Sequence, residues 1–147
     1  MKRRLARENA VMALYEASFN ATQIEDIIAA SRESKENEID SFGEALIVNF
    51  YAHSSEVDDA IKSKLKDWTL DRLPRVDAAI LRLAVTEMIF STEEDMDSVV
   101  INEAVEIAKK YSGDSNYQFI NGVLGALAHK TEVDETPCEA SETQGES

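Results

Sequence analysis

The segment from Leu73 to Phe90, LPRVDAAILRLAVTEMIF, is the feature that most constrains the fold. At helical spacing its apolar residues form two adjacent stripes, so a helix here is apolar on nearly every side. Such a helix is buried, and at about 1.5 Å per residue it would run ~25 Å, the width of a small domain. Pro74, which lacks an amide hydrogen and suits a first helical turn, marks its start. We therefore expect a central buried helix along which the other helices pack.

Four charged residues interrupt this apolar helix: Arg75, Asp77, Arg82 and Glu87. Arg82 lies among residues that we expect to be buried, and a buried charge needs a partner. Two interpretations of Arg82 stay open. It forms a structural ion pair with Asp77 or with another helix, or it recognises an anionic ligand at the edge of the central helix.

The composition favours one helical domain. The chain has 147 residues, of which 44% are hydrophobic, and it contains only five glycines and two prolines. Together with alanine-rich segments of helical period, this predicts an all-α protein. The single cysteine, Cys138, cannot form an internal disulfide, and no apolar run has the length of a membrane span or the layout of a signal peptide. We expect a cytoplasmic protein with no membrane partner.

Helical periods and capping residues divide the rest of the chain. Asp40 or Ser41 suits the cap of one helix, and the segment from Trp68 to Leu73 forms a short connection between two packed halves. The expected single domain covers residues 1–130, with halves of about 1–67 and 68–130. Helices are predicted near 3–19, 24–28, 41–51, 54–67, 102–111 and 115–127, and loops over 31–40 and 91–98. Residues 131–147 are acidic and lack aromatics, which predicts a disordered tail.

The net charge of −14 normally argues against a nucleic-acid partner, but the charges are unevenly distributed. Residues 131–147 hold six acidic side chains and no basic one, and residues 25–44 hold seven acidic and two basic ones. Basic residues instead gather at the N-terminus, in a group that we call the N-terminal basic cluster: Lys2, Arg3, Arg4 and Arg7. The negative total therefore hides a local positive site.

The N-terminal basic cluster lies in the first two turns of its predicted helix, where cations oppose the helix dipole. An unfavourable position has two explanations here. The cluster is a frayed, solvated end of the chain, or it contacts phosphates. Glu8 is the one nearby acid that can offset its charge.

The sequence offers no catalytic pattern. His53 and His129 are far apart and lack the companions of a metal site or of a catalytic dyad, and no phosphate-binding glycine loop or nucleophile elbow occurs. We expect no reaction, no metal and no cofactor.

Three segments resemble the NusB family, the all-helical transcription antitermination factors. They are RRLARENAVMALYEA near the start, DWTLDRLPRVDAAILRLAVTEM in the middle, and VVINEAVEIAKKYSGDSNYQFINGVLGAL near the end. Their order and spacing cover most of residues 3–127, and the third segment is the most specific of them. The resemblance implies two perpendicular three-helix halves and no catalysis. It also implies binding of the boxA element of ribosomal RNA leader transcripts, together with the small-subunit ribosomal protein that acts as NusE.

The same resemblance implies the site residues. Arg3, Arg4 and Arg7 match the family's N-terminal arginines for RNA, Ser115 and Phe119 border the RNA site, and Arg82 is a further candidate there. Tyr15 and Asp77 match positions associated with the NusE contact. Other Nus factors and RNA polymerase follow as indirect partners. The resemblance also allows a homodimer, because some relatives self-associate through the RNA and partner face.

The sequence departs from the family at two site positions. Thr86 stands where many relatives have tyrosine, and Ser115 stands where some have aspartate. Phe119 is as well explained by core packing as by stacking on an RNA base.

Two alternative functions stay open. The chain resembles the N-terminal RNA-recognition region of certain rRNA cytosine methyltransferases, although those enzymes need a downstream cofactor-binding domain and this chain ends in the acidic tail. A structural helical protein without RNA binding is the other alternative.

Overall fold

The computed structural model describes residues 1–19, 23–66, 69–91, 96–112 and 116–135. These residues form seven α-helices, one short 3-10 helix at Leu70–Arg72 and no strand, which confirms the all-α prediction. The α-helices are α1 (Arg3–Phe19), α2 (Ile24–Ser34), α3 (Ser41–Ala52), α4 (Ser54–Lys62), α5 (Arg75–Phe90), α6 (Asp97–Tyr111) and α7 (Asn116–Glu135).

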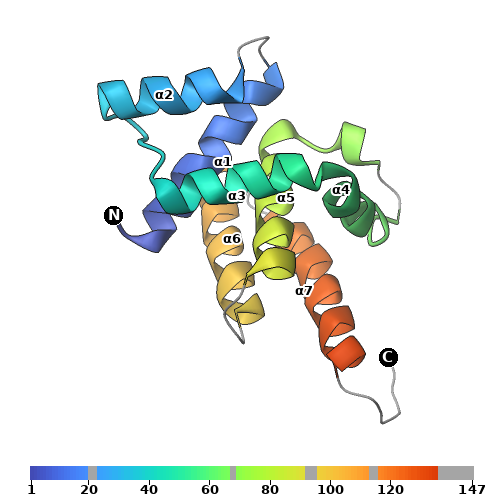
Figure 1. Ribbon diagram of the computed structural model, residues 1–147. Helices are drawn as coiled ribbons and strands as arrows, with labels where there is room; N and C mark the ends of the chain where they lie inside the picture. Colours follow the sequence, from blue (N-terminus) through green and yellow to red (C-terminus); the bar gives the residue numbers. More distant parts are fainter. Residues whose placement is uncertain (20–22, 67–68, 92–95, 113–115, 136–147) are drawn as a thin grey trace.

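Helix α5 is the central helix of the fold. It begins directly after Pro74, and its residues 77–81 and 83–87 are buried, which leaves Arg82 as a half-buried exception. It packs against α1, α3, α4, α6 and α7 and lies in the middle of the molecule (Figure 1). The prediction of a buried helix surrounded by others is confirmed.

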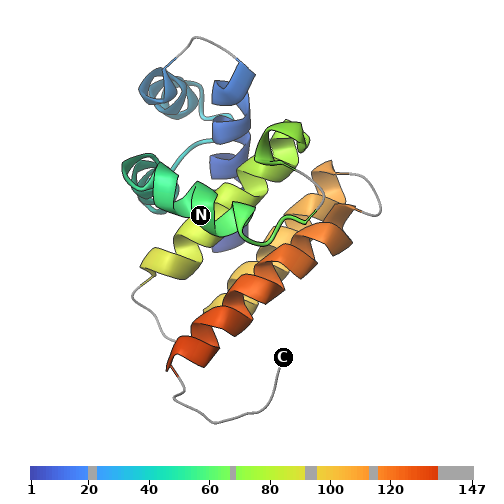
Figure 2. The ribbon, with the colours of Figure 1, turned by 90° about the vertical axis from the view of Figure 1, so that its right-hand side faces the viewer.

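The remaining helices cover α5 from different sides. Helices α6 and α7 pack side by side as an antiparallel pair (Figure 2), while α2 packs against α1 at the edge of the molecule (Figure 1). None of the helices in the described part of the chain is long and apolar enough to cross a membrane.

The start of α3 is held against α1 by local polar contacts. Asp40 caps α3, as predicted, because its carboxylate accepts a hydrogen bond from the amide of Gly43 at 2.8 Å. The side-chain amide of Asn9 donates to the carbonyl of Glu38 at 3.0 Å and fastens the preceding loop to α1. A Cβ atom at Gly43 would lie 3.4 Å from the carbonyl oxygen of Ala6, so α3 and α1 are in contact at this position. These contacts bring the first turn of α3 beside the N-terminal basic cluster.

Several predicted boundaries are wrong. Helix α2 runs on to Ser34, into the segment that we expected to be a loop, and α4 ends at Lys62 rather than near residue 67. Helix α6 begins at Asp97 rather than at Asn102, because the β-branched run at 99–101 is helical and buries Val100 against the core. Packing here outweighs the weak helix propensity of valine and isoleucine.

The end of the last helix also differs from the prediction. Helix α7 extends to Glu135, beyond the expected end near residue 127, while the disordered tail stays a prediction. Residues 136–147 and the segments around Trp68 and Ser115 lie outside the described residues.

Candidate functional site

An open groove of about 670 Å³ lies between α1, α3, α5 and the start of α6, and we call it the arginine groove. Three members of the N-terminal basic cluster line one side of it: Arg3, Arg4 and Arg7. The rest of its lining is mainly apolar and aromatic, with one exposed amide, and includes Phe42, Asn49, Phe90, Met96 and Val99. The structure therefore brings the predicted arginines together beside an aromatic surface that the sequence alone did not reveal.

Arg7 is the buried member of the cluster. Its guanidinium donates two hydrogen bonds to the carboxylate of Glu87 on α5, from Nε at 2.9 Å and from Nη2 at 2.6 Å. The two side chains are only 9% and 6% exposed. A buried bidentate pair of this kind fixes α1 against α5, and a carboxylate already occupies the face of the guanidinium that would receive a phosphate.

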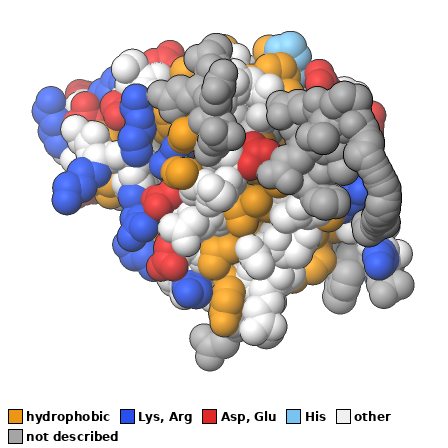
Figure 3. Space-filling model, turned by 90° about the horizontal axis from the view of Figure 1, so that it is seen from below, with side chains coloured by type: hydrophobic (Ala, Val, Ile, Leu, Met, Phe, Trp, Pro, Cys, Tyr) orange, Lys and Arg blue, Asp and Glu red, His pale blue; other side chains and the backbone are white. Residues whose placement is uncertain are grey.

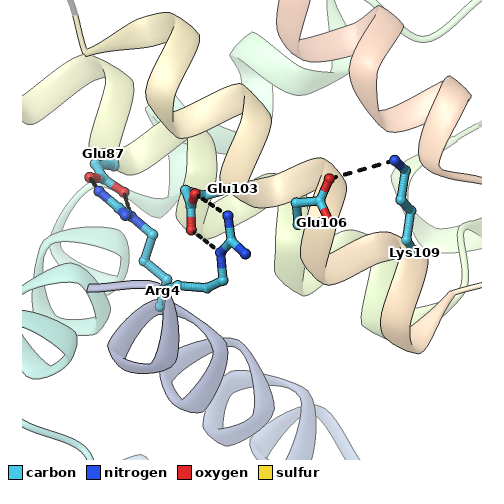
Figure 4. A network of polar contacts seen from close by, with 6 residues as sticks. Arg4, Glu87, Glu103, Glu106 and Lys109 are labelled. Carbon is cyan, nitrogen blue, oxygen red and sulfur yellow. Dashed lines mark hydrogen bonds and ion pairs between the residues drawn. The ribbon is translucent and has the colours of Figure 1, made fainter. Parts of the chain in front are cut away.

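Arg4 is exposed and is held at the surface by α6. Its guanidinium donates to the carboxylate of Glu103 from Nε at 2.8 Å and from Nη2 at 2.9 Å. Figure 4 shows Arg4 reaching from α1 to Glu103, with Glu87 nearby on the neighbouring helix. The hydrogen bonds from Arg4 lower the pKa of Glu103 and outweigh the effect of its partial burial. Any anion that binds Arg4 would have to displace Glu103 or share the guanidinium with it.

Arg3 differs from both neighbours because it lies over an aromatic ring. Its guanidinium carbon is 4.1 Å from the centre of the Phe42 ring, which is a cation–π arrangement. The Arg3 side chain makes no ion pair with the described residues. Arg3 is therefore the exposed guanidinium of the groove that no carboxylate within the described chain neutralises.

One face of the molecule carries mixed charge. In the view from below, Lys and Arg side chains gather on the left of the molecule with acidic side chains among them (Figure 3). Glu8 follows the same pattern, since it accepts hydrogen bonds from Lys110 at 2.7 Å and from the hydroxyl of Tyr111. Burial raises the pKa of Glu8, but the two hydrogen bonds outweigh it and the net pKa is lowered. Glu8, Glu87 and Glu103 thus hold Lys110, Arg7 and Arg4 in defined positions.

Arg82 forms a structural ion pair with another helix. Its Nε and Nη2 donate to the carboxylate of Asp58 on α4 at 3.0 and 3.2 Å, and its guanidinium lies 5.5 Å from the Phe50 ring. Asp77, the other proposed partner of Arg82, instead accepts hydrogen bonds from Ser112 and Asn116. Arg82 does not line the arginine groove, so its contact with RNA stays a prediction that the groove does not support.

Asp77 is buried at the start of α5 and is 2% exposed. Its carboxylate accepts hydrogen bonds from the hydroxyl of Ser112 and, at 3.1 Å, from the amide of Asn116, so it joins α5 to the end of α6 and the start of α7. Burial raises the pKa of Asp77 and the two hydrogen bonds only partly oppose this. In this conformation the carboxylate does not reach the surface, so the structure does not support a direct partner contact through it.

Two of the remaining predicted site residues, Phe119 and Tyr15, do not line the groove. Ser115 is outside the described residues, and Phe119 is half-buried near the start of α7, where it packs against the core. Tyr15 is half-buried near the end of α1 and contacts Phe19 edge to face, with ring centres 4.9 Å apart. Arg75 lies over the Phe19 ring at 4.7 Å, and Phe19 itself is 57% exposed. Tyr15, Phe19 and Arg75 thus form an aromatic surface at the C-terminal end of α1.

Sequence reasoning missed three residues that shape the groove: Phe42, Glu87 and Glu103. Glu87 could have been found, because an acid on a helix that is apolar all round demands a buried cation. Phe42 and Glu103 carry no comparable signal, since their contacts with α1 depend on how α3 and α6 pack. The described residues contain no group of His, Cys, Asp and Glu suited to a metal ion.

Comparison with known proteins identifies the family. Residues 4–129 match the model of the NusB family. The transcription antitermination protein NusB of Bacillus mycoides is 44% identical over 128 residues, which are 86% of this chain and 97% of that protein. The structure of NusB from T. maritima gives a TM-score of 0.77 at 30% identity and covers 92% of this chain and 99% of its own.

A second solved structure adds a complex. A chain in the crystal structure of the antitermination factors NusB and NusE with dsRNA gives a TM-score of 0.77 at 27% identity. The match covers 87% of this chain and 96% of that one. The likeness therefore extends over nearly the whole described fold.

Proposed function

This chain belongs to the NusB family of transcription antitermination proteins, and we propose that it works by binding boxA-type single-stranded RNA together with NusE. The observation that carries the proposal is the arginine groove, in which exposed guanidinium groups flank an open aromatic surface. Single-stranded RNA is bound in this way, with cations on the phosphates and flat side chains against unstacked bases. The function requires no catalytic step.

The three arginines have different roles in the proposal. Arg4 is exposed and contacts a phosphate, with Glu103 as the competing carboxylate. Arg3 is exposed at the mouth of the groove and contacts RNA without giving up an ion pair within the described residues. Arg7 is buried with Glu87, so its part in RNA binding is to hold α1 in place.

We further propose that NusE docks on the aromatic surface at the end of α1, formed by Tyr15, Phe19 and Arg75. An exposed aromatic ring beside a guanidinium is typical of residues that anchor protein interfaces. Asp77 supports this surface from within by fixing the start of α5. The RNA and the partner then occupy opposite ends of α1.

Two finer features belong to the same proposal. The central position of α5 supports two helical halves, about 1–67 and 68–130, packed around it. Other Nus factors and RNA polymerase are reached indirectly through the RNA and NusE, in the cytoplasm, and a homodimer formed through the same surfaces would be inactive.

Fluorescence anisotropy tests the proposal. A labelled short boxA-type RNA is titrated with the full chain, alone and with purified NusE, in single-stranded and double-stranded form. We expect tighter binding of the single strand, and tighter binding again with NusE. Equal, weak binding of every RNA with and without NusE would contradict the proposed function. Tyr15→Ala should abolish the gain from NusE and leave binding of RNA alone unchanged.

A further inference from the structure

We propose that Arg3 and Phe42 form a stacking platform for one unpaired nucleobase of the bound RNA, at the mouth of the arginine groove. This inference rests on the proposed RNA binding and names how one part of the surface recognises its ligand. In this assignment Arg3 recognises a base with the plane of its guanidinium, rather than a phosphate with its charge alone.

The two groups are close enough to stack. The Arg3 guanidinium carbon lies over the Phe42 ring, 4.1 Å from its centre, which is a separation at which a guanidinium packs on an aromatic face. Because Arg3 is exposed and makes no ion pair with the described residues, its other face is open to a ligand. Bases in single-stranded RNA stack on guanidinium planes as well as on aromatic rings. A base placed on that face completes a three-layer stack of the Phe42 ring, the Arg3 guanidinium and the base.

The platform is preorganised because the core holds the ring. Phe42 is half-buried against the core in the first turn of α3, two residues after the Asp40 cap. The Arg7 guanidinium lies 5.3 Å from the centre of the same ring, and its two hydrogen bonds to Glu87 fix it. Little side-chain entropy is lost when a ligand binds to a rigid platform. The buried Arg7–Glu87 pair therefore contributes to RNA recognition indirectly, by holding the Phe42 ring in place.

The surroundings suit a base rather than an acidic protein segment. The groove continues from Phe42 past the exposed amide of Asn49, a group that can donate to and accept from a base edge. Phe90 lies further along, stacked on His53 with ring centres 4.3 Å apart. Arg4 lies on the same side as Arg3 and is the cation available to an adjoining phosphate. The groove therefore combines cations on one side with aromatic and amide groups in the rest of its lining, the two kinds of group found in sites for single-stranded nucleic acid.

Three variants separate stacking from charge. Arg3→Lys keeps the charge but loses the plane, and Lys does not replace Arg at a stacked site. Phe42→Leu keeps an apolar side chain but removes the ring. Tyr51→Leu removes an exposed ring from the same helix outside the groove and is the matched control. The folding of each variant is checked by circular dichroism and thermal melting. If Phe42→Leu does not fold, Arg3→Lys still tests the proposal, because it changes an exposed side chain.

The readout is a scan of the RNA itself. Each nucleotide of a short single-stranded boxA-type RNA is made abasic in turn, and affinity is measured with wild type and variants. We expect one position whose abasic form binds wild type about tenfold more weakly, the size of one base–aromatic stack. Arg3→Lys and Phe42→Leu should each bind the intact RNA about tenfold more weakly than wild type. Making that one nucleotide abasic should then weaken their binding little further, since the protein substitution and the missing base remove the same contact. Tyr51→Leu should behave as wild type.

The outcomes are distinct. Arg3→Lys with wild-type affinity, or losses that simply add at every RNA position, would overturn the platform and leave Arg3 as a point charge. An effect of Phe42→Leu on NusE binding with RNA affinity unchanged would assign the groove to the protein partner and overturn it as well. Wild type that binds no RNA, even with NusE, would overturn the proposed function and the platform together.

Discussion

Arg7 and Glu87 lie eighty positions apart in the sequence and meet through two hydrogen bonds of 2.9 and 2.6 Å inside the fold. Both side chains are buried, so the pair links α1 to the central helix beneath the arginine groove. Desolvation offsets much of the attraction between such charges, and the net contribution of the pair to stability is therefore small. Its function is positional, because it fixes the helix that carries Arg3 and Arg4.

Removing one member of this pair should be costly. Glu87→Ala leaves the Arg7 charge buried without its carboxylate, and we expect the free energy of unfolding to fall by about 3 kcal/mol or more. Glu106→Ala, which removes a carboxylate from the exposed pair with Lys109, is the control and should cost less than about 1 kcal/mol. Urea denaturation measures both. Similar small losses in the two variants would show that Arg7 and Glu87 are not buried together.

Asp77 should give the stability of the protein a distinct dependence on pH. Its pKa is raised in the folded state, so the native protein binds this proton more tightly than the unfolded chain does. The stability that comes from this proton is present below the unfolded pKa of about 3.9 and is lost as pH rises through the folded pKa. Asp77→Asn keeps the shape and removes the buried charge. We expect the variant to gain stability over wild type as pH rises from about 4 to 7.

The Asp77 measurement is a difference between two proteins, because Glu8 and Glu103 have lowered pKa values and contribute with the opposite sign. Those contributions cancel when wild type and Asp77→Asn are compared at each pH. A difference in unfolding free energy that stays constant across the range would show that the carboxyl group is not buried. Partner binding in Asp77→Asn should remain, since the carboxylate does not reach the surface.

The fold was predictable where periodicity and capping agree. The central helix, α1 and the Asp40 cap follow directly from apolar spacing, Pro74 and a capping carboxylate. The start of α6 was not predictable in this way. Its β-branched residues have weak helix propensity, and only the burial of Val100 against other helices decides the outcome. Local signals therefore predict helices, whereas packing decides several of their ends.

The site shows a similar division. A sequence pattern can place Arg3, Arg4 and Arg7 near one another, because they lie on two turns of one helix. It cannot show that Arg7 is buried, that Arg4 meets Glu103 or that Arg3 lies over Phe42, since each contact joins α1 to a helix distant in sequence. Three chemically alike residues thus acquire three roles from their tertiary partners.

Leu83 tests the packing of the central helix. It is 3% exposed on α5, and Leu83→Ala should cost roughly 2 to 5 kcal/mol and lower the melting temperature by about 5 °C or more. Leu5→Ala makes the same change at a side chain that is 48% exposed and should alter stability by less than about 0.5 kcal/mol. Calorimetry measures both. Equal shifts would show that Leu83 is not part of the core.

The pair of Arg4 with Glu103 makes a prediction about salt. If an RNA phosphate contacts Arg4, Arg4→Ala should weaken RNA binding. It should also reduce the slope of log affinity against log salt by about 0.7, the value for one lost phosphate contact with a single strand. Glu103→Gln keeps a hydrogen-bond acceptor for Arg4 but removes the charge that repels the phosphate. It should tighten binding at low salt, and the gain should fade as salt rises because the interaction is screened.

Glu106→Gln is the control for the salt experiment, because Glu106 lies one turn further along α6 and pairs with Lys109 instead. We expect its effect on RNA affinity to be smaller than that of Glu103→Gln at every salt concentration. An unchanged slope in Arg4→Ala would exclude a phosphate contact at Arg4. Weaker binding by Glu103→Gln would show that the carboxylate orients Arg4 for the RNA, so that competition with the phosphate is outweighed by preorganisation of the guanidinium.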